Sequence, residues 1–334
     1  MDQSDWCFIS GVVSAREGQL FSEQFFMSLL ACDSLEDVFL AVADTNLKNV
    51  FPRLSSLGDA DAVLSGLANE EFNELRKLCP NPAIADLLLM QNEFYNTKGH
   101  LKAKLAEIPF TEIPNGSITA ETVERLWNAM ETPFDDVMSE PFAAIHNLAT
   151  ELKEGLPTLI DWVLDNAFLC WMLKQAAKLC TKTFHAPLIA DHIVPFVKFK
   201  VFEIIWRACA AGADMKLFAE SFLSGELDQP EFHSHCTAGL DERRAMLSKY
   251  LPEEAVNTVF SEETGLLDRL QKQADDFLIE AIGEAKGIAF GPERVFGYLC
   301  GLQQQTYNLR LCIAGKVNSI HADLLRSRLR RTYA

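Results

Sequence analysis

Apolar residues recur at helical spacing along most of the chain. Val123, Leu126, Trp127 and Met130 follow the i, i+3, i+4, i+7 spacing of one helical face, and the segment 266–278 repeats it. Sustained alternation of apolar and polar residues, which is the pattern of a half-buried strand, does not occur between turn signals. The pattern therefore predicts an all-α protein whose apolar stripes are core faces.

Local signals indicate where some of these helices begin. Ser34 followed by Asp37 predicts a capping box, because the hydroxyl can accept from an orphan backbone N–H in the first turn. At Gly291-Pro292-Glu293 we expect the glycine to close one helix in the left-handed conformation, the proline to open the next, and the glutamate to lie near its positive end. First-turn proline also predicts helix starts at Pro133, Pro141 and Pro157.

A weak internal repeat is present. Residues 96–104 align with 308–316, 212 positions further on, and an asparagine, a base and a terminal lysine recur in step. A fainter copy at 201–209 keeps Arg207 opposite Lys102. Three polar matches in nine positions also fit a chance similarity. If the repeat is real, offsets of about 105 residues predict three helical units that bury their apolar stripes against one another; they are 1–110, 111–215, in which the motif is degraded, and 216–334.

Composition and charge narrow the class of protein. The 334 residues are 49% hydrophobic and 23% charged, which is typical of a folded globular chain. A net charge of −17 repels phosphate backbones and argues against a nucleic-acid partner. A local exception is the basic cluster near the C-terminus, for which we favour a solvated helix end over contact with an acidic partner; it comprises Arg326, Arg328, Arg330 and Arg331.

Membrane and targeting signals are weak. The N-terminal residues lack the basic region of a signal peptide, and charged residues interrupt the apolar stretches 161–180 and 193–213. We therefore predict a cytoplasmic protein without a membrane span of its own. Nine dispersed cysteines without a Cys-x-x-Cys pair predict reduced, mostly buried thiols.

The common catalytic motifs are missing from the sequence. It has no phosphate-binding Gly-x-x-x-x-Gly-Lys-Ser/Thr loop, no Gly-x-Gly-x-x-Gly, no Gly-x-Ser-x-Gly and no His-Glu-x-x-His. Adjacent acids such as Asp275-Asp276 are more typical of solvated charge than of acid–base catalysis. Two imidazoles and a thiol, His233, His235 and Cys236, suit a borderline-soft metal, although a loop with incidental histidines is the favoured interpretation. We predict no enzyme activity, no cofactor and no metal.

Three ordered segments resemble the family of C subunits of V-type ATPases and ATP synthases, whose eukaryotic member is the d subunit of the proton pumps. Residues 8–16 are similar to the family's opening helix, although Ser14 stands where the family has asparagine. Residues 92–104 are similar to its Asn-x-Lys-x-x-Leu-Lys-Ala-Lys segment, and residues 290–333 to its closing segment. The middle third contributes little beyond a helix at 161–177.

The resemblance implies an all-α funnel of three similar units around a pseudo-three-fold axis. It implies a non-catalytic protein, monomeric in isolation, that joins the central shaft to the membrane-embedded rotor ring of a proton- or sodium-translocating complex. The positions that carry the motif or its repeat are implied to be structural or partner-facing. These positions are Arg16, Asn96, Lys98, Lys102, Lys104, Arg207, Gly291, Pro292, Glu293, Asn308, Arg310, Gly315 and Lys316. For the two asparagines among them we favour a structural role. The alternatives are a soluble helical-repeat scaffold without rotary partners and a metal-dependent helical enzyme using His233 to Cys236.

Overall fold

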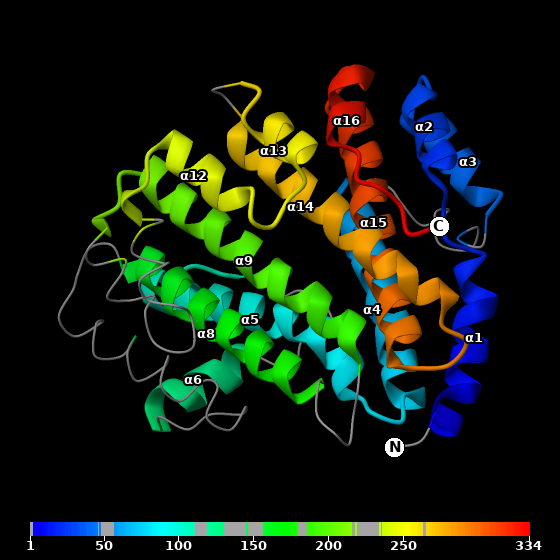
Figure 1. Cartoon of the computed structure of the whole chain (residues 1–334), viewed down its shortest axis with the longest axis horizontal. Coiled ribbons are helices and arrows are strands. Elements are labelled where there is room, and N and C mark those ends of the chain that lie inside the picture. The colour runs from blue at the N-terminus through cyan, green and yellow to red at the C-terminus, as the bar shows by residue number, and fades with distance from the viewer. Residues whose placement is uncertain are drawn as a thin grey trace. The chain divides into compact units, whose positions relative to one another are not determined.

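The chain is seen here as a computed structural model, shown in Figure 1. It describes residues 3–45, 47, 57–110, 119–129, 145, 156–179, 186–215, 218, 234, 236–262 and 265–334. Every regular element in these ranges is helical, which confirms the all-α prediction. The predicted helix starts at Pro133 and Pro141 lie outside the described residues, whereas Pro157 is the second residue of a helix.

The helices differ widely in length. The short ones are η1 (Gln3–Trp6), α1 (Cys7–Glu17), α2 (Glu23–Ala31), α3 (Leu35–Ala43), α6 (Ala120–Ala129), α12 (Leu240–Leu247), α13 (Glu253–Val259), η3 (Glu284–Gly287) and α16 (Ala322–Arg328). The long ones are α4 (Leu57–Leu78), α5 (Ala83–Ala106), α8 (Leu156–Leu179), α9 (Pro187–Ala210), α14 (Leu266–Gly283) and α15 (Pro292–Val317).

The chain divides into two compact units. Unit 1 combines residues 1–88, 182–192 and 268–334, and unit 2 combines residues 89–181 and 193–267. The division into three repeats at 1–110, 111–215 and 216–334 stays a prediction.

Three long helices share the same kind of start. Pro82 directly precedes α5, and Pro187 and Pro292 are the first residues of α9 and α15, so the three prolines stand 105 residues apart. Proline suits a first turn because its missing N–H would have no helical partner there. The predicted start at Pro292 is therefore confirmed, and the same signal opens the other two helices.

The same three helices also share their ends. In each, a residue in the left-handed region follows the last turn: Glu107, Gly212 and Ser319, with φ values of 54°, 68° and 52°. The next N–H then reaches back to the carbonyl five residues earlier, as in Ala213 to Ala208 at 3.0 Å and Ile320 to Gly315 at 2.8 Å. This hydrogen bond is the mark of a Schellman motif, which satisfies carbonyls that the helix end leaves free.

The two predicted caps have different outcomes. The Ser34 capping box is present, because the Asp37 N–H donates to Ser34 Oγ at 3.1 Å and the Ser34 N–H donates to the Asp37 carboxylate at 3.1 Å. The expectation that Gly291 closes a helix was wrong. The preceding 3-10 helix already ends at Gly287, and Gly291 is the N-cap of α15, with a φ of 157° and a ψ of 169°.

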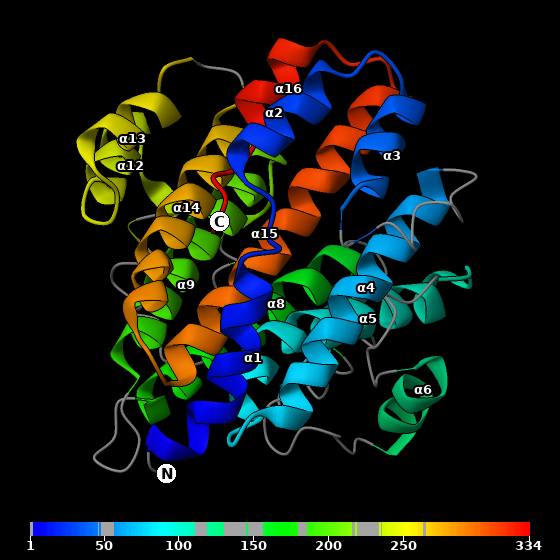
Figure 2. The ribbon, with the colours of Figure 1, turned by 90° about the vertical axis from the view of Figure 1, so that its right-hand side faces the viewer.

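Helix α15 is the central element of unit 1. It packs against α1, α2, α3, α4 and α16, and Figure 2 shows α1 and α4 running alongside it. Leu309, Cys312 and Ile313 of α15 share one apolar cluster with residues of α2 and α3 such as Phe26 and Val38. Each such side chain contributes about 1.5–3 kcal/mol when it leaves water, so the cluster fixes how these helices pack.

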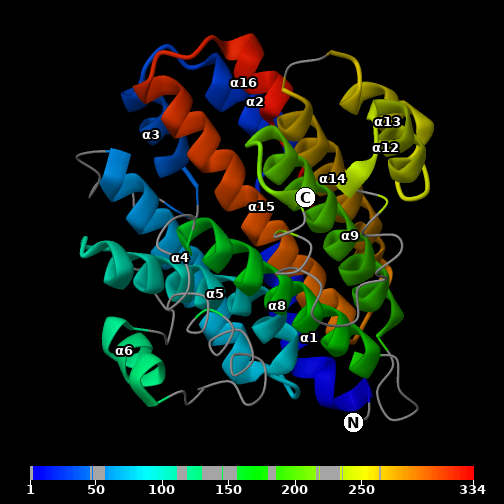
Figure 3. The ribbon, with the colours of Figure 1, turned by 90° about the vertical axis from the view of Figure 1, so that its left-hand side faces the viewer.

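Unit 2 has its own core, built on α5, α8 and α9. Phe94 of α5 packs on Phe168 of α8 with ring centroids 5.3 Å apart, and Trp162 of α8 packs edge-on against Phe218 at 4.7 Å. Figure 3 shows these three helices together. Aromatic pairs in this range add stabilisation beyond the area that they bury.

The non-glycine residues at two of the helix ends give a first prediction. Glu107→Gly and Ser319→Gly should each raise the free energy of unfolding by about 0.5–1 kcal/mol, because glycine occupies the left-handed region without the Cβ clash. Thermal unfolding followed by circular dichroism should show a higher Tm for both variants. The control Gly212→Ala should lower it, and a Tm that fell in all three variants would contradict this interpretation.

A histidine in the first part of α9, residues 187–192, which belongs to unit 1, contacts α14 and α15. His192 Nδ1 lies 3.2 Å from the Leu278 carbonyl of α14, so this nitrogen carries the proton and donates. Its ring packs edge-on against Phe296 of α15 at 5.3 Å. Burial lowers the pKa of His192 from 6.5 to about 4. The side chain is therefore neutral in the folded state at physiological pH.

This lowered pKa predicts a pH effect on stability. Between pH 6.5 and 4 the unfolded chain binds a proton at His192 that the folded chain does not, so stability falls as the pH falls through this window. His192→Gln keeps a donor and removes the titration, so urea unfolding at pH 7 and pH 5 should show a loss about 1–2 kcal/mol smaller than in the wild type. The exposed His321, changed to Gln, is the control. An equal loss in His192→Gln and the wild type would refute the prediction.

Candidate functional site

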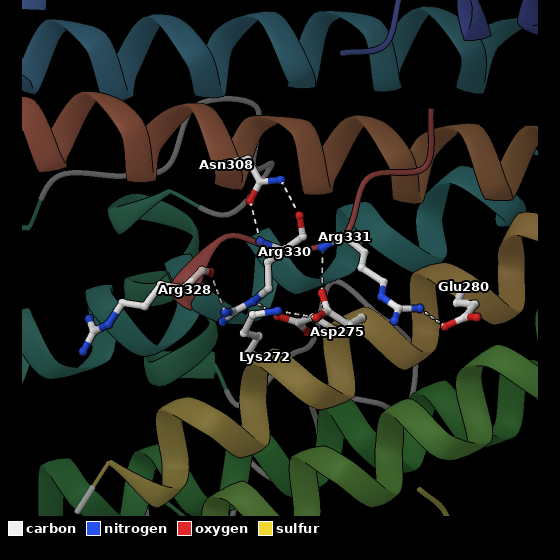
Figure 4. A network of polar contacts seen from close by, with 8 residues as sticks. Lys272, Asp275, Glu280, Asn308, Arg328, Arg330 and Arg331 are labelled. Carbon is white, nitrogen blue, oxygen red and sulfur yellow. Dashed lines mark hydrogen bonds and ion pairs between the residues drawn. The ribbon is translucent and has the colours of Figure 1, made fainter. Parts of the chain in front are cut away.

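The C-terminal residues 329–334 form a tail that docks on unit 1. Asn308 of α15 is fully buried and pairs with the backbone of Arg330 at both ends of its amide. Its Nδ2 donates to the Arg330 carbonyl at 2.9 Å, and its Oδ1 accepts from the Arg330 N–H at 3.0 Å. Figure 4 shows both bonds. One side chain thus supplies the two hydrogen bonds that a neighbouring strand would otherwise give to this residue.

The arginine side chains of the tail bind acids on α14. Arg330 is 3% exposed, and its Nε donates to Asp275 Oδ2 at 2.9 Å. The Arg331 N–H donates to Asp276 Oδ1 at 2.6 Å, and its guanidinium pairs with Glu280; Figure 4 shows these arginines facing α14. The expectation of a solvated basic end was therefore wrong for Arg330. A buried guanidinium needs a compensating negative charge. Here Asp275 of the same chain supplies that charge.

Two glycines of α15 make room for the tail. A Cβ on Gly301 would lie 2.6 Å from the Cβ of Tyr333, and one on Gly297 would lie 2.7 Å from its hydroxyl. Tyr333 is 3% exposed in this notch, and the Lys286 ammonium lies 4.6 Å from its ring centroid. Any larger side chain at either glycine would push the ring outward. Gly315 acts in the same way for α16, since a Cβ there would overlap the side chain of Leu325.

A polar network on α1, α4 and α15 borders a cavity of about 290 Å³. Arg16 donates to Glu71 at 2.6 Å and to Glu74 at 2.7 Å, and the Tyr298 hydroxyl donates to the same Glu71 oxygen at 3.0 Å. Burial and the Glu71 charge raise the pKa of Tyr298, so it stays a neutral donor. Gln305, also in the wall, accepts the Phe21 N–H at 2.7 Å. These hydrogen bonds fix the positions of the polar side chains that border the cavity.

The other motif residues of α15 serve packing contacts. Lys316 Nζ donates to the carbonyls of Leu30 and Cys32 at 2.9 and 2.5 Å and so caps the C-terminus of α2. Arg310 donates to Ser65 Oγ of α4. Glu293 is buried in the first turn of α15, beside the positive helix end.

In unit 2 the motif lysines lie in ion pairs. Lys98 Nζ is 2.5 Å from Asp165, and Lys102 Nζ is 2.5 Å from Asp161. The lysines are four residues apart on α5 and the aspartates four apart on α8, so the pairs form two rungs between antiparallel helices. Burial raises the pKa of Asp165 despite the opposing charge of Lys98. We call these two pairs the α5–α8 ladder.

Three more motif residues complete unit 2. Lys104 pairs with the exposed Glu124 of α6 at 2.9 Å. Arg207 pairs with Glu203 along α9, where Lys200 also binds that carboxylate at 2.8 Å. Asn96 is fully buried in α5. The motif positions are thus distributed over both units.

The remaining candidates are placed only in part. His233 and His235 lie outside the described residues, while Cys236 is half-buried. In the described ranges no three His, Cys, Asp or Glu side chains group as metal ligands. Among the helices that the structure describes, none has the length and apolar character needed to cross a membrane.

The sequence identifies the motif residues but does not indicate which side chains they contact. The Asp275-Asp276 pattern indicated solvated charge, yet both acids hold the tail. The spacing of Gly297 and Gly301, one helical turn apart on the same face of a helix, was the available signal for a close contact. Glu71 and Glu74 carried no signal that linked them to Arg16, which is 55 residues away from Glu71.

The tail contact gives a stability prediction. Asn308→Ala leaves the buried N–H and C=O of Arg330 without partners and should cost about 3 kcal/mol of unfolding free energy. The control Asn318→Ala removes an exposed amide that bonds Ala314 at the end of the same helix, and should cost under about 1 kcal/mol. Urea unfolding measures both. Equal losses in the two variants would mean that the tail contact contributes nothing.

Comparison with known proteins places this architecture in a family. The sequence profile of the family described as ATP synthase (C/AC39) subunit matches residues 9–328. The C subunit of the V-type sodium ATPase of Enterococcus hirae is 22% identical over 336 residues, which cover 97% of this chain and 98% of that protein. The match extends far beyond the three segments that carried the resemblance, and it confirms that resemblance. The chain belongs to the ATP synthase (C/AC39) subunit family.

Proposed function

We propose that this chain is a non-catalytic rotor adaptor that couples the central shaft of a V-type ATPase or ATP synthase to its membrane-embedded ring. The observation that carries the proposal is the family match over residues 9–328. The name of the Enterococcus hirae relative, which assigns it to a V-type sodium ATPase, supports the choice of a V-type complex. In this role the chain is a peripheral cytoplasmic protein, used once per rotor and monomeric when isolated, and the complex moves protons or sodium ions.

The three-repeat organisation is part of this proposal. Its support is the recurrence of proline-started long helices at 82, 187 and 292, and of left-handed helix ends at 107, 212 and 319. Three long helices with the same start and end at this spacing favour three similar units around a pseudo-three-fold axis. Such an arrangement would suit a part that rotates between two ring-like partners.

The mechanical demand on an adaptor is stiffness. A protein that transmits torque must not deform between its two partner contacts, and packed helices joined by polar contacts are stiff. The α5–α8 ladder in unit 2 and the Asn308–Arg330 pairing in unit 1 are contacts of this kind. We therefore assign most motif residues a structural role within the adaptor, and we expect the partner surfaces elsewhere.

Association with the complex tests the proposal. Tagged chain expressed in its own host and purified from membranes in mild detergent should bring shaft and ring proteins, identified by mass spectrometry. As a control, Gly301→Leu pushes Tyr333 out of its notch and should not be assembled. If the wild-type chain stays in the soluble fraction without these proteins, the rotor role falls and a free scaffold is left. If the wild-type chain and Gly301→Leu capture the same proteins, the capture is non-specific and supports neither the rotor role nor the free scaffold.

A further inference from the structure

The cavity of about 290 Å³ in unit 1 is lined by residues of α1, α4 and α15 and by residues close to these helices. Figure 2 shows the three helices side by side. We propose that the cavity is a binding site for a small aliphatic primary amine, whose ammonium group binds Glu71 and whose hydrocarbon chain lies along the apolar wall. Six leucines contribute to that wall: Leu20, Leu47, Leu64, Leu67, Leu302 and Leu309.

Two hydrogen bonds fix the direction in which α4 and α15 pass each other along the cavity. The Tyr298 hydroxyl donates to Glu71 at 3.0 Å, and Arg310, twelve residues further along α15, donates to Ser65 Oγ. Since Ser65 precedes Glu71 by six residues, the two helices are antiparallel here. The cavity therefore has a polar end at Tyr298 and Glu71 and an apolar end at Leu309.

The polar end carries an excess of negative charge. Arg16 is already bound by two carboxylates, because it donates to Glu71 at 2.6 Å and to Glu74 at 2.7 Å. The neighbouring Glu17 pairs with Arg294 at 2.6 Å and so adds no net charge. A further carboxylate would be repelled at this end of the cavity, whereas an ammonium group would be attracted.

Glu71 can accept another hydrogen bond. Both hydrogen bonds that the described residues give to its carboxylate, from Arg16 and Tyr298, reach the same oxygen, Oε1. A carboxylate offers about four lone-pair sites on its two oxygens, so Oε2 can accept from a ligand. The Glu71 side chain is 23% exposed and borders the cavity, which makes it accessible to a ligand that enters from solvent.

The neutral polar side chains of the wall are bonded within the chain. Gln305 is 6% exposed and accepts the Phe21 N–H at 2.7 Å, and the Thr306 hydroxyl donates to the Leu302 carbonyl at 2.8 Å. These bonds hold the two side chains in the wall. Selection of the head group is thereby left to the charged end of the cavity.

The volume and length of the cavity set the size of the ligand. A water molecule takes up about 30 Å³ of the liquid and a methylene group is of similar size, so the cavity holds on the order of eight to ten non-hydrogen atoms. Tyr298 and Leu309 stand 11 residues apart on α15, which is about 16 Å along the helix. A six-carbon chain fits within this length. Apolar walls with a few polar groups that fix orientation are typical of small-molecule sites.

Calorimetric titration of the wild-type chain at pH 7 tests the site without the rest of the complex and without assuming a rotor role. Hexylamine, hexan-1-ol and hexanoate share one hydrocarbon chain, and methylamine supplies the ammonium group alone. We expect hexylamine to bind at one site, about tenfold or more tightly than each of the other three. Equal binding of hexan-1-ol would mean that the carboxylate selects nothing, and equal binding of methylamine that the amine merely binds an acidic surface. Either result, or no binding of hexylamine, would overturn the proposal.

Two variants locate the bound amine. Glu71→Gln should lower the affinity for hexylamine to that for hexan-1-ol, and Ala68→Leu, which fills part of the cavity, should weaken both ligands. The control Glu253→Gln removes an exposed carboxylate of α13 in unit 2 and should bind as the wild type does. If Glu71→Gln or Ala68→Leu kept the wild-type affinity for hexylamine, the amine would lie elsewhere and the proposal would be wrong. If a variant fails to fold, the comparison of the four ligands on the wild-type chain still decides.

Discussion

Unit 1 depends on the docking of the last six residues against α15. Without the tail, Asn308 would lack the two hydrogen bonds that it makes with Arg330, and the notch at Gly297 and Gly301 would lack the Tyr333 side chain that fills it. The tail fills the groove with Tyr333 and satisfies the asparagine with the backbone of Arg330. Because the neighbouring arginines bind acids on α14, the same six residues tie α14 and α15 together. The core helix and the C-terminus therefore stabilise each other.

Much of the local structure could be predicted from the sequence. Helical periodicity gives the all-α class, and the Ser34 capping box and the start at Pro292 follow from backbone groups that only nearby residues can satisfy. Gly291 was predicted wrongly because a glycine before proline fits both the end of one helix and the N-cap of the next. The residues next to Gly291 in the sequence fit a helix end and an N-cap equally well. The N-cap position is distinguished by the hydrogen bond from the Gly291 N–H to Ser10 Oγ, 281 residues away.

The contacts of the candidate site were less predictable than the helices, because they too depend on residues far apart in the sequence. The motif residues were found, but a charged side chain shows neither which opposite charge it meets nor how deeply it lies. Arg330 and Asp275 are 55 residues apart, and Lys98 and Asp165 are 67 apart. Only the packing of helices brings such pairs together. A basic cluster in an acidic chain is therefore as consistent with an internal anchor as with a partner surface.

The proposed rotor role is a claim about coupling between ATP hydrolysis and ion transport, and coupling is therefore the property to measure. Membrane vesicles from cells with and without the gene can be assayed in parallel for ATP hydrolysis and ATP-driven ion transport. If the chain joins shaft to ring, vesicles without it will hydrolyse ATP without moving ions, and restoring the gene will restore transport. Transport that persists at the wild-type ratio of ions to ATP without the chain would contradict the account.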